Sequence, residues 1–180
     1  MTILNIETST SACSAAITID GVEVASVEKL AEANHASDLP VFVQQLLQEA
    51  QKNNWHLDAV ALSQGPGSYT GLRIGASLAK GLCYGLNIPL IPIDTLQLLC
   101  AALQLENIPN NALLCPMLDA RRMEVYTAFY LQGDKNFEPK CEVQAKIIDH
   151  QSFAEELDMY PIYFFGNGAD KCQAVIQHTN

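Results

Sequence analysis

The chain has 180 residues, of which 49% are hydrophobic and 17% are charged, and it contains no compositionally biased tract. This composition excludes an intrinsically disordered, collagen-like or coiled-coil protein and indicates a globular one. Ten basic against twenty acidic side chains give a formal charge of -10. Because this is the wrong sign for binding phosphate backbones directly, we expect any contact with nucleic acid to be indirect.

The cysteines and the amino terminus indicate the compartment. None of the cysteines forms a CxxC pair, and most lie among apolar neighbours, as reduced core cysteines do (Cys13, Cys83, Cys100, Cys115, Cys141, Cys172). The first ten residues, MTILNIETST, lack a basic start and a long apolar stretch, and no run of eighteen apolar residues occurs anywhere. We therefore expect a cytoplasmic protein without a membrane segment.

The first hundred residues alternate between strand and helix patterns. Three strands are predicted over 2–8, 14–19 and 22–29, the last two joined by the hairpin pair Asp20-Gly21. An apolar stripe from Leu39 to Ala50 then predicts a helix with Pro40 in its first turn. A strand, a helix, a strand and a helix follow (58–64, 70–86, 88–93, from Thr95). This α/β order, an antiparallel meander followed by αβαβ in a mixed sheet, is that of the ribonuclease H-like core of actin-like ATPases.

The remainder reads as a second lobe. A Pro- and Asn-containing linker at 106–111 separates an amino-terminal lobe, 1–105, from a second and incomplete ribonuclease H-like lobe, 110–180. Strands, a short helix and the start of a last helix are predicted in it (strands 112–119, 124–131, 142–148 and 162–165; helices 152–157 and after Gly168).

Two polar loops raise the question of a phosphate site. Gly65 and Gly67 allow a tight turn, and Ser68 can cap the helix that follows, so this junction suits an anion but also an ordinary capped helix. It lacks both GxGxxG spacing and a Walker lysine, which favours the capped helix. Thr8 and Ser9 lie in a turn that suits a phosphate or a plain polar hairpin. These five residues are the candidate phosphate-binding set.

The helix over 70–86 contains two rows of small residues. Gly71, Gly75 and Ala79 form one row, and Ser77, Gly81 and Gly85 form a second. Glycine destabilises an exposed helix by up to about 1 kcal/mol relative to alanine, so this density requires a packing reason. Packing within the chain and packing against a partner's helix remain equally open.

No catalytic or metal-binding constellation is evident. The four histidines are far apart and form no HxxxH or HExxH pair, so no metal site is predicted (His35, His56, His150, His178). No serine lies in a GxSxG elbow, and no cysteine has an evident histidine partner. Arg121 and Arg122 follow Asp119 in a turn that reads as salt-bridged or, less favourably, as an anchor for a ligand or partner.

Four segments together resemble the TsaB (YeaZ) family of tRNA threonylcarbamoyladenosine biosynthesis proteins. They are ILNIETST at the start, SQGPGSYTGLRIG from Ser63, AKGL with IPLIPIDTLQLL, and DARRMEVY from Asp119. HASDL, from His35, also resembles that family's entry into its first long helix. Known members continue beyond a segment like GNGAD (166–170), so the resemblance leaves the completeness of the second lobe open.

The resemblance implies a non-catalytic subunit in the formation of N6-threonylcarbamoyladenosine at position 37 of tRNAs reading codons that begin with A. Its partners would be the catalytic paralogue TsaD in a heterodimer, the ATPase TsaE, and a second copy when TsaD is absent, with tRNA bound only indirectly. No intrinsic cofactor is implied, although ATP or ADP at the complex interface remains open. TsaD-type sequences have an HxxxH metal pair where this chain reads IPIDTLQLL. Such proteins were once grouped with glycoprotein endopeptidases (family M22), but this sequence shows neither the metal site nor the activated nucleophile that proteolysis requires.

The resemblance also places the partner interface on the first two helices. The interface residues implied there are Leu39, Phe42, Val43, Gly71, Leu72, Arg73, Gly75, Ala76, Ala79, Lys80 and Cys83. Two other functions stay open: a stand-alone ATP-dependent small-molecule kinase or ATPase using the two polar loops, and a homodimer with a purely structural purpose. Fold alone does not separate them.

Overall fold

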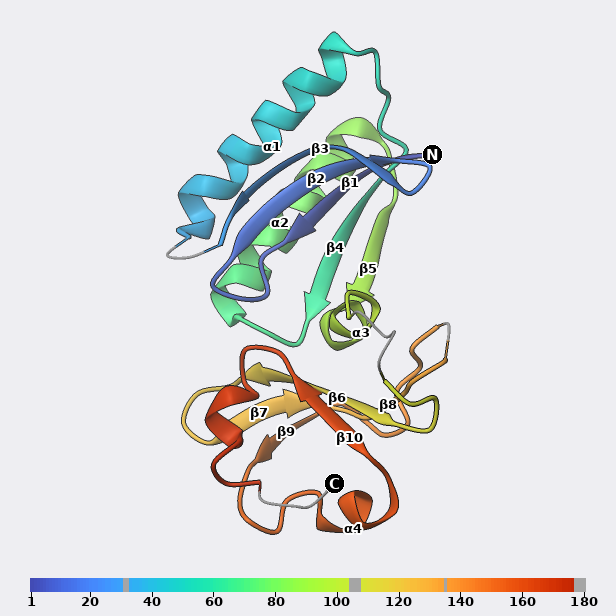
Figure 1. Ribbon diagram of the computed structural model, residues 1–180. Coiled ribbons are helices and arrows are strands. Elements are labelled where there is room, and N and C mark those ends of the chain that lie inside the picture. Colours follow the sequence, from blue (N-terminus) through green and yellow to red (C-terminus); the bar gives the residue numbers. More distant parts are fainter. Residues whose placement is uncertain (31–32, 104–107, 135, 177–180) are drawn as a thin grey trace. The chain divides into compact units, whose positions relative to one another are not determined.

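The computed structural model describes residues 1–30, 33–103, 108–134 and 136–176, which form two compact units divided between Thr95 and Leu96 (Figure 1). The predicted linker at 106–111 lies partly outside the described residues. The division falls earlier than the sequence suggested, because helix α3 (Thr95–Ala101) contributes Leu96 and Cys100 to a core of the carboxyl-terminal unit. No helix among the described residues is long and apolar enough to span a bilayer.

The amino-terminal unit is built on a five-stranded mixed sheet of order β3-β2-β1-β4-β5. Strands β1 and β2 pair antiparallel, as do β2 and β3, while β4 and β5 extend the sheet in parallel. The strands span Thr2–Glu7, Cys13–Ile19, Val22–Lys29, Ala59–Gly65 and Leu90–Asp94. Asp20 and Gly21 have positive φ in the hairpin, which confirms the turn predicted from the sequence.

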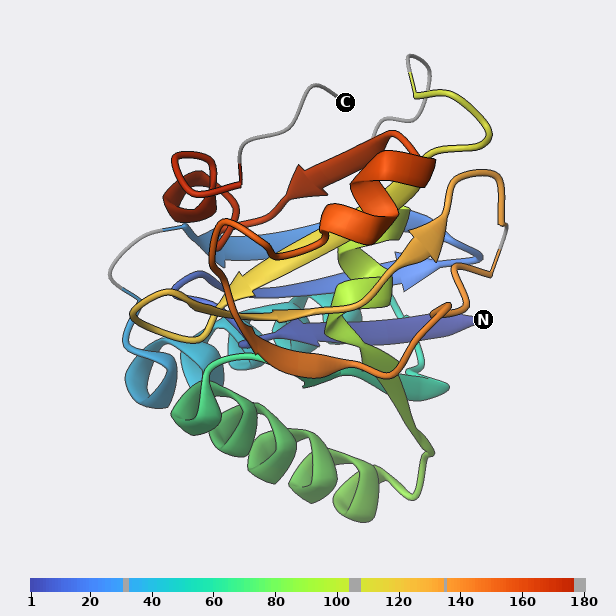
Figure 2. The ribbon, with the colours of Figure 1, turned by 90° about the horizontal axis from the view of Figure 1, so that it is seen from below.

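Helices α1 (His35–Lys52) and α2 (Tyr69–Leu86) cover one face of this sheet (Figure 2). Alternate strand residues face the helices because side chains alternate along a strand, and an apolar helical stripe meets them. The buried core includes Leu4, Ile6, Ile17, Val60 and Leu62 from the strands and Leu39, Val43, Leu46 and Ala79 from the helices.

Helix α1 begins earlier than predicted, which moves Pro40 out of its first turn. The helix begins at His35, so Pro40 is the sixth residue and lies inside it. The earlier start is stabilised by the carbonyl of Asn34, which accepts hydrogen bonds from the backbone N–H groups of Ser37 and Asp38 at 3.0 and 2.8 Å. The expectation that Pro40 occupies the first turn was therefore wrong.

The carboxyl-terminal unit repeats the strand plan of the first. Its main sheet has the order β10-β6-β7-β9, in which β6, β7 and β9 are antiparallel and β10 is parallel to β6. These strands span Leu113–Asp119, Glu124–Thr127, Gln144–Ile147 and Ile162–Phe165, and helix α4 (Ala154–Met159) precedes the last of them. Among the described residues of this unit, β10 has no parallel neighbour in the place that β5 takes beside β4.

Two predicted elements of this unit differ from the structure. The strand expected over 124–131 is interrupted at residues 128–129, and its end, β8 (Tyr130–Leu131), continues the antiparallel pairing with β6 in the register of β7. The helix expected after Gly168 is a single 3-10 turn, Asp170–Cys172, within the described part of the chain.

Candidate functional site

The turn after β1 and the loop after β4 lie directly against each other at the carboxyl edge of the first sheet. The backbone N–H of Ser68 donates to the carbonyl of Ser9 at 2.6 Å. A Cβ on Gly67 would lie 2.4 Å from that same carbonyl oxygen, and one on Gly71 would lie 2.1 Å from the carbonyl oxygen of Thr8. These distances are shorter than any tolerated contact, so the close approach depends on glycine at both positions.

This contact settles which row of small residues on α2 packs inside the chain. Gly75 completes the row, since a Cβ there would meet Thr8 Oγ1 at 2.4 Å, and Ala79 is fully buried. Leu39 and Val43 of α1 are also buried in the core. Gly71, Gly75, Ala79, Leu39 and Val43 therefore pack within the amino-terminal unit, and their expected place in direct contact with a partner is corrected.

The five candidate phosphate-binding residues come together, but the N–H and hydroxyl groups of Ser68 and the N–H of Ser9 are already hydrogen-bonded within the unit. Ser68 Oγ accepts the N–H of Gly71 at 3.2 Å as a helix cap, while the N–H of Ser68 is used by Ser9. The carboxylate of Glu7 accepts the N–H of Ser9 at 2.5 Å, which places a negative charge inside the turn. A phosphate would be repelled there, so this unit in its present arrangement does not offer a preformed phosphate cradle. The arrangement gives no support to the kinase alternative.

Three buried hydroxyl groups at this edge lack a hydrogen-bond partner among the described residues. They belong to Thr8, Ser9 and Ser63, whose side chains are at most 4% exposed. The hydroxyl of Thr8 lies under α2, in the space that Gly75 leaves open. Its placement ties the β1–β2 turn to the helix by packing rather than by hydrogen bonding.

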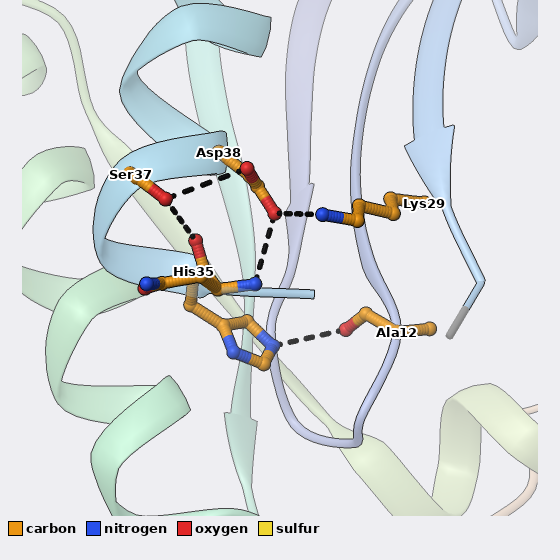
Figure 3. A network of polar contacts seen from close by, with 6 residues as sticks. Ala12, Lys29, His35, Ser37 and Asp38 are labelled. Atoms are coloured by element: carbon orange, nitrogen blue, oxygen red, sulfur yellow. Dashed lines mark hydrogen bonds and ion pairs between the residues drawn. The ribbon is translucent and has the colours of Figure 1, made fainter. Parts of the chain in front are cut away.

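A polar network fixes the entry into α1 (Figure 3). Asp38 accepts hydrogen bonds from Lys29 Nζ at 3.1 Å and from the N–H of Asn34 at 2.9 Å. The hydrogen bond from Lys29 is the main reason that the pKa of Asp38 lies below its ordinary value. His35 Nε2 lies 3.0 Å from the carbonyl oxygen of Ala12 in the β1–β2 turn. His35 is the first residue of α1, so the HASDL segment does form the entry into the first long helix.

The opposite side of α2 faces outward. Tyr69, Arg73, Ser77, Lys80 and Tyr84 recur at helical spacing and are all exposed. We call this set the α2 stripe. A groove of about 510 Å³ runs beside its first half, between α1 and α2, lined by Ala36, Pro40, Tyr69, Thr70, Arg73, Ile74, Ser77 and Leu78.

The stripe includes only two of the interface residues that the sequence suggested, Arg73 and Lys80. Four other suggested residues are half-buried on the two helices (Phe42, Leu72, Ala76, Cys83). Sequence reasoning missed the tyrosines, which are 68% exposed at Tyr69 and 92% exposed at Tyr84. Their spacing from Arg73 and Lys80, four residues in each case, is the signal that identifies them.

The thiol groups in the described residues are poorly suited to nucleophilic chemistry. Burial raises the pKa of Cys13 to about 11 and that of Cys115 to about 12. The pKa values of Cys83 and Cys172 are also raised by burial. A thiol reacts as its thiolate, so these cysteines act as core residues. No group of three metal-ligating side chains comes together in the part of the chain that the structure describes.

In the carboxyl-terminal unit the turn between β6 and β7, which corresponds to the β1–β2 turn of the first unit, is stabilised by an ion pair. Asp119, at the end of β6, accepts from the N–H of Arg121 at 2.9 Å and pairs with Lys171, which lowers its pKa. Lys171 Nζ also donates to the carbonyl of Glu124 at 2.7 Å. The ion pair agrees with the salt-bridged turn predicted from the sequence, but its cation is Lys171 rather than an arginine. Arg121 and Arg122 are exposed and have positive φ.

Comparison with known proteins identifies the family. A family model described as TsaD, tRNA N6-adenosine threonylcarbamoyltransferase, matches residues 24–179. A Bacillus subtilis protein named tRNA threonylcarbamoyladenosine biosynthesis protein TsaB is 30% identical over 178 residues, which cover 98% of this chain and 76% of that protein. The chain belongs to the TsaB (YeaZ) family. The TsaB proteins of Haemophilus influenzae and Escherichia coli are 36% and 38% identical, over 70% and 76% of this chain, respectively. The matched part spans only 52% and 57% of those two TsaB proteins.

Solved structures support the same assignment. YeaZ from Pseudomonas aeruginosa superposes with a TM-score of 0.71 at 25% identity, over 92% of this chain and 84% of that one. A second Pseudomonas aeruginosa structure, described as an uncharacterized protein with similarity to peptidase YEAZ, gives 0.79 at 26% identity, over 98% and 81%. The actin-like ATPase fold in two lobes, expected for TsaB, is thereby confirmed.

Proposed function

We propose that this chain is a non-catalytic subunit of the machinery that forms N6-threonylcarbamoyladenosine at position 37 of tRNA, and that it binds a TsaD chain through the outer face of α1 and α2. The relatives named TsaB support the proposed role in threonylcarbamoyladenosine formation. The α2 stripe and its neighbouring groove support the outer face of α1 and α2 as the binding surface, because exposed tyrosines and an arginine beside an apolar groove are typical of interface anchors.

A supporting role, rather than catalysis, is consistent with the state of the reactive groups. The carboxylate of Glu7 is bound to the N–H of Ser9, and His35 contacts the carbonyl of Ala12. The thiols of Cys13 and Cys115 are strongly disfavoured as thiolates. These groups stabilise the turn and the core, so we assign the chemistry to the partner. Recruitment of TsaE, self-association in the absence of TsaD and cytoplasmic location belong to the same proposal.

The test is co-purification of the full-length chain with the TsaD-family protein encoded in the same genome. Ser77→Trp places a bulky ring at the centre of the α2 stripe without entering the core, and it should abolish the complex. Glu155→Trp, at an exposed position on α4, is the matched control and should bind as wild type. Gly75→Trp and Ala79→Arg are unsuitable, because both would disrupt the core.

A complex that tolerates Ser77→Trp would remove α2 from the interface. Normal tRNA modification in a deletion strain, measured by mass spectrometry of tRNA nucleosides, would instead support a purely structural homodimer and contradict the proposed function.

A further inference from the structure

The turn between β1 and β2, residues 8–12, contacts the amino-terminal ends of both helices that cover the first sheet. On the α2 side the carbonyl of Ser9 accepts the N–H of Ser68 at 2.6 Å. On the α1 side the carbonyl oxygen of Ala12 lies 3.0 Å from His35 Nε2 (Figure 3). This short turn therefore holds the starts of two helices that come from different parts of the sequence.

The same two helix starts form one end of the groove between α1 and α2. Ala36, which lines the groove from α1, is the residue after His35. Tyr69, which lines it from α2, is the residue after Ser68. Because each of these lining residues is adjacent to a residue that the turn binds, the turn fixes how far apart the two sides of the groove lie at this end.

The turn is attached to the two helices in different ways. It is attached to α2 by backbone packing, since Gly67 and Gly71 let it approach so closely that no Cβ would fit. It is attached to α1 by a side chain, through the hydrogen bond of His35. The nearby ion pair of Lys29 with Asp38 joins α1 to β3 and not to the turn. His35 is therefore the contact through which the turn positions the start of α1.

The chemistry of this contact assigns a proton on the imidazole ring. A carbonyl oxygen only accepts hydrogen bonds, so His35 Nε2 must carry a proton and donate it to Ala12. Thr10 Oγ1 accepts the N–H of Ala12 at 3.2 Å, which braces the turn at the residue that His35 binds. The acceptor of the His35 proton is thus held in place within the turn itself.

We propose that the β1–β2 turn sets the width of the groove between α1 and α2, and that His35 is the positioning residue that holds α1 at this width. The inference rests on the proposed function, in which this face binds a TsaD chain. His35 lies beside the groove lining and acts through the arrangement of the two helices. Without its donor the arrangement that fits the partner is populated less, and the apparent affinity falls by the same factor.

The test compares three substitutions of His35 by calorimetric titration of the full-length chain with the TsaD-family protein of the same genome. The amide nitrogen of glutamine lies as many bonds from Cα as histidine Nε2, so His35→Gln retains the donor and should bind as wild type. In His35→Asn the amide is one bond nearer the backbone, and in His35→Leu the donor is absent. Both should bind about fivefold more weakly, the factor that corresponds to one net hydrogen bond.

Two further measurements separate positioning from a general loss of stability. Urea denaturation followed by Trp55 fluorescence should show that the amino-terminal unit of each variant is folded under the conditions of the titration. If His35→Leu does not fold, the comparison of His35→Asn with His35→Gln takes its place. Nuclear magnetic resonance of the wild-type chain should show neutral His35 protonated at Nε2. Protonation at Nδ1 alone would overturn the inference, because Nε2 could not then donate to Ala12.

The outcomes separate this inference from the proposed function. If Ser77→Trp abolishes the TsaD complex while folded His35→Leu binds as wild type, the docking face stands and the positioning role is overturned. Equal weakening by His35→Gln and His35→Leu would also overturn it, since the hydrogen bond would not be the cause. If Ser77→Trp binds normally, the docking face itself is overturned and the inference falls with it.

Discussion

Two glycines on the same helix should respond in opposite directions to the addition of one methyl group. Gly71 lies where a Cβ would come within 2.1 Å of the carbonyl oxygen of Thr8, whereas a Cβ on Gly81 would meet nothing within 4 Å. Alanine is the better helix former at both positions. We therefore expect Gly81→Ala to stabilise the amino-terminal unit and Gly71→Ala to destabilise it.

The magnitudes follow from these surroundings. Gly81→Ala should raise the free energy of unfolding by about 0.5–1 kcal/mol, the usual helix-interior value. At Gly71 the new methyl group meets backbone, which cannot rotate away, so the turn at Thr8 and Ser9 must shift. Overpacking of this kind costs about 1–3 kcal/mol. Weakening the 2.6 Å hydrogen bond between Ser68 and Ser9 adds about 1 kcal/mol. After the helix-propensity gain of about 0.5–1 kcal/mol is subtracted, we expect a net loss of about 1–3 kcal/mol.

Urea denaturation followed by tryptophan fluorescence measures the difference. The chain has a single tryptophan, Trp55, which packs against the core of the amino-terminal unit and therefore reports on that unit alone. The midpoint of Gly71→Ala should fall by about 1–2 M urea, while that of Gly81→Ala should rise slightly. Equal stability of Gly71→Ala and wild type would show that the close approach of turn and helix is absent.

Two further variants test neighbouring contacts. Gly75→Ala should destabilise the amino-terminal unit, because its Cβ would lie 2.4 Å from Thr8 Oγ1. Adding Thr8→Ala should relieve most of this loss of stability. If the two substitutions have additive effects in a double-mutant cycle, the contact is contradicted. The hydrogen bond from Lys29 holds the pKa of Asp38 in the folded protein below the ordinary value of 3.8. The ionised carboxylate therefore stabilises the fold above pH 3.8, and this stabilisation is lost as the pH falls through the lower pKa of the folded state. Asp38→Asn should therefore be less stable than wild type at pH 7, with a difference in urea midpoint that shrinks below pH 3.8; a difference independent of pH would exclude this role.

The order of elements could be predicted because its signals are local. Strand alternation, the Asp20-Gly21 hairpin and the apolar stripe of α1 each depend on residues close together in the sequence. The prediction was less accurate where a distant partner decides the outcome. The strand expected over 124–131 keeps one antiparallel register along β6, from Val125 opposite Asp119 to Leu131 opposite Leu113, but it is interrupted at Ala128 and Phe129. The N–H and the carbonyl of Phe129 are bonded to Cys141 and Lys140, which come from a later segment of the chain. Similarly, α3 joins the carboxyl-terminal core through Leu96, a contact with no local signal.

For the candidate site, too, some features could be predicted from the sequence and others depended on tertiary structure. From sequence alone, α2 had to pack closely against something, because glycine and alanine recur along it at helical spacing, and the family was evident from its motifs. Which side of the helix is buried depended on the Thr8–Ser9 turn, some sixty residues earlier in the chain, which lies on Gly71 and Gly75. Only tertiary structure brings that backbone to the helix, and its arrival leaves Arg73 and Lys80 facing outward.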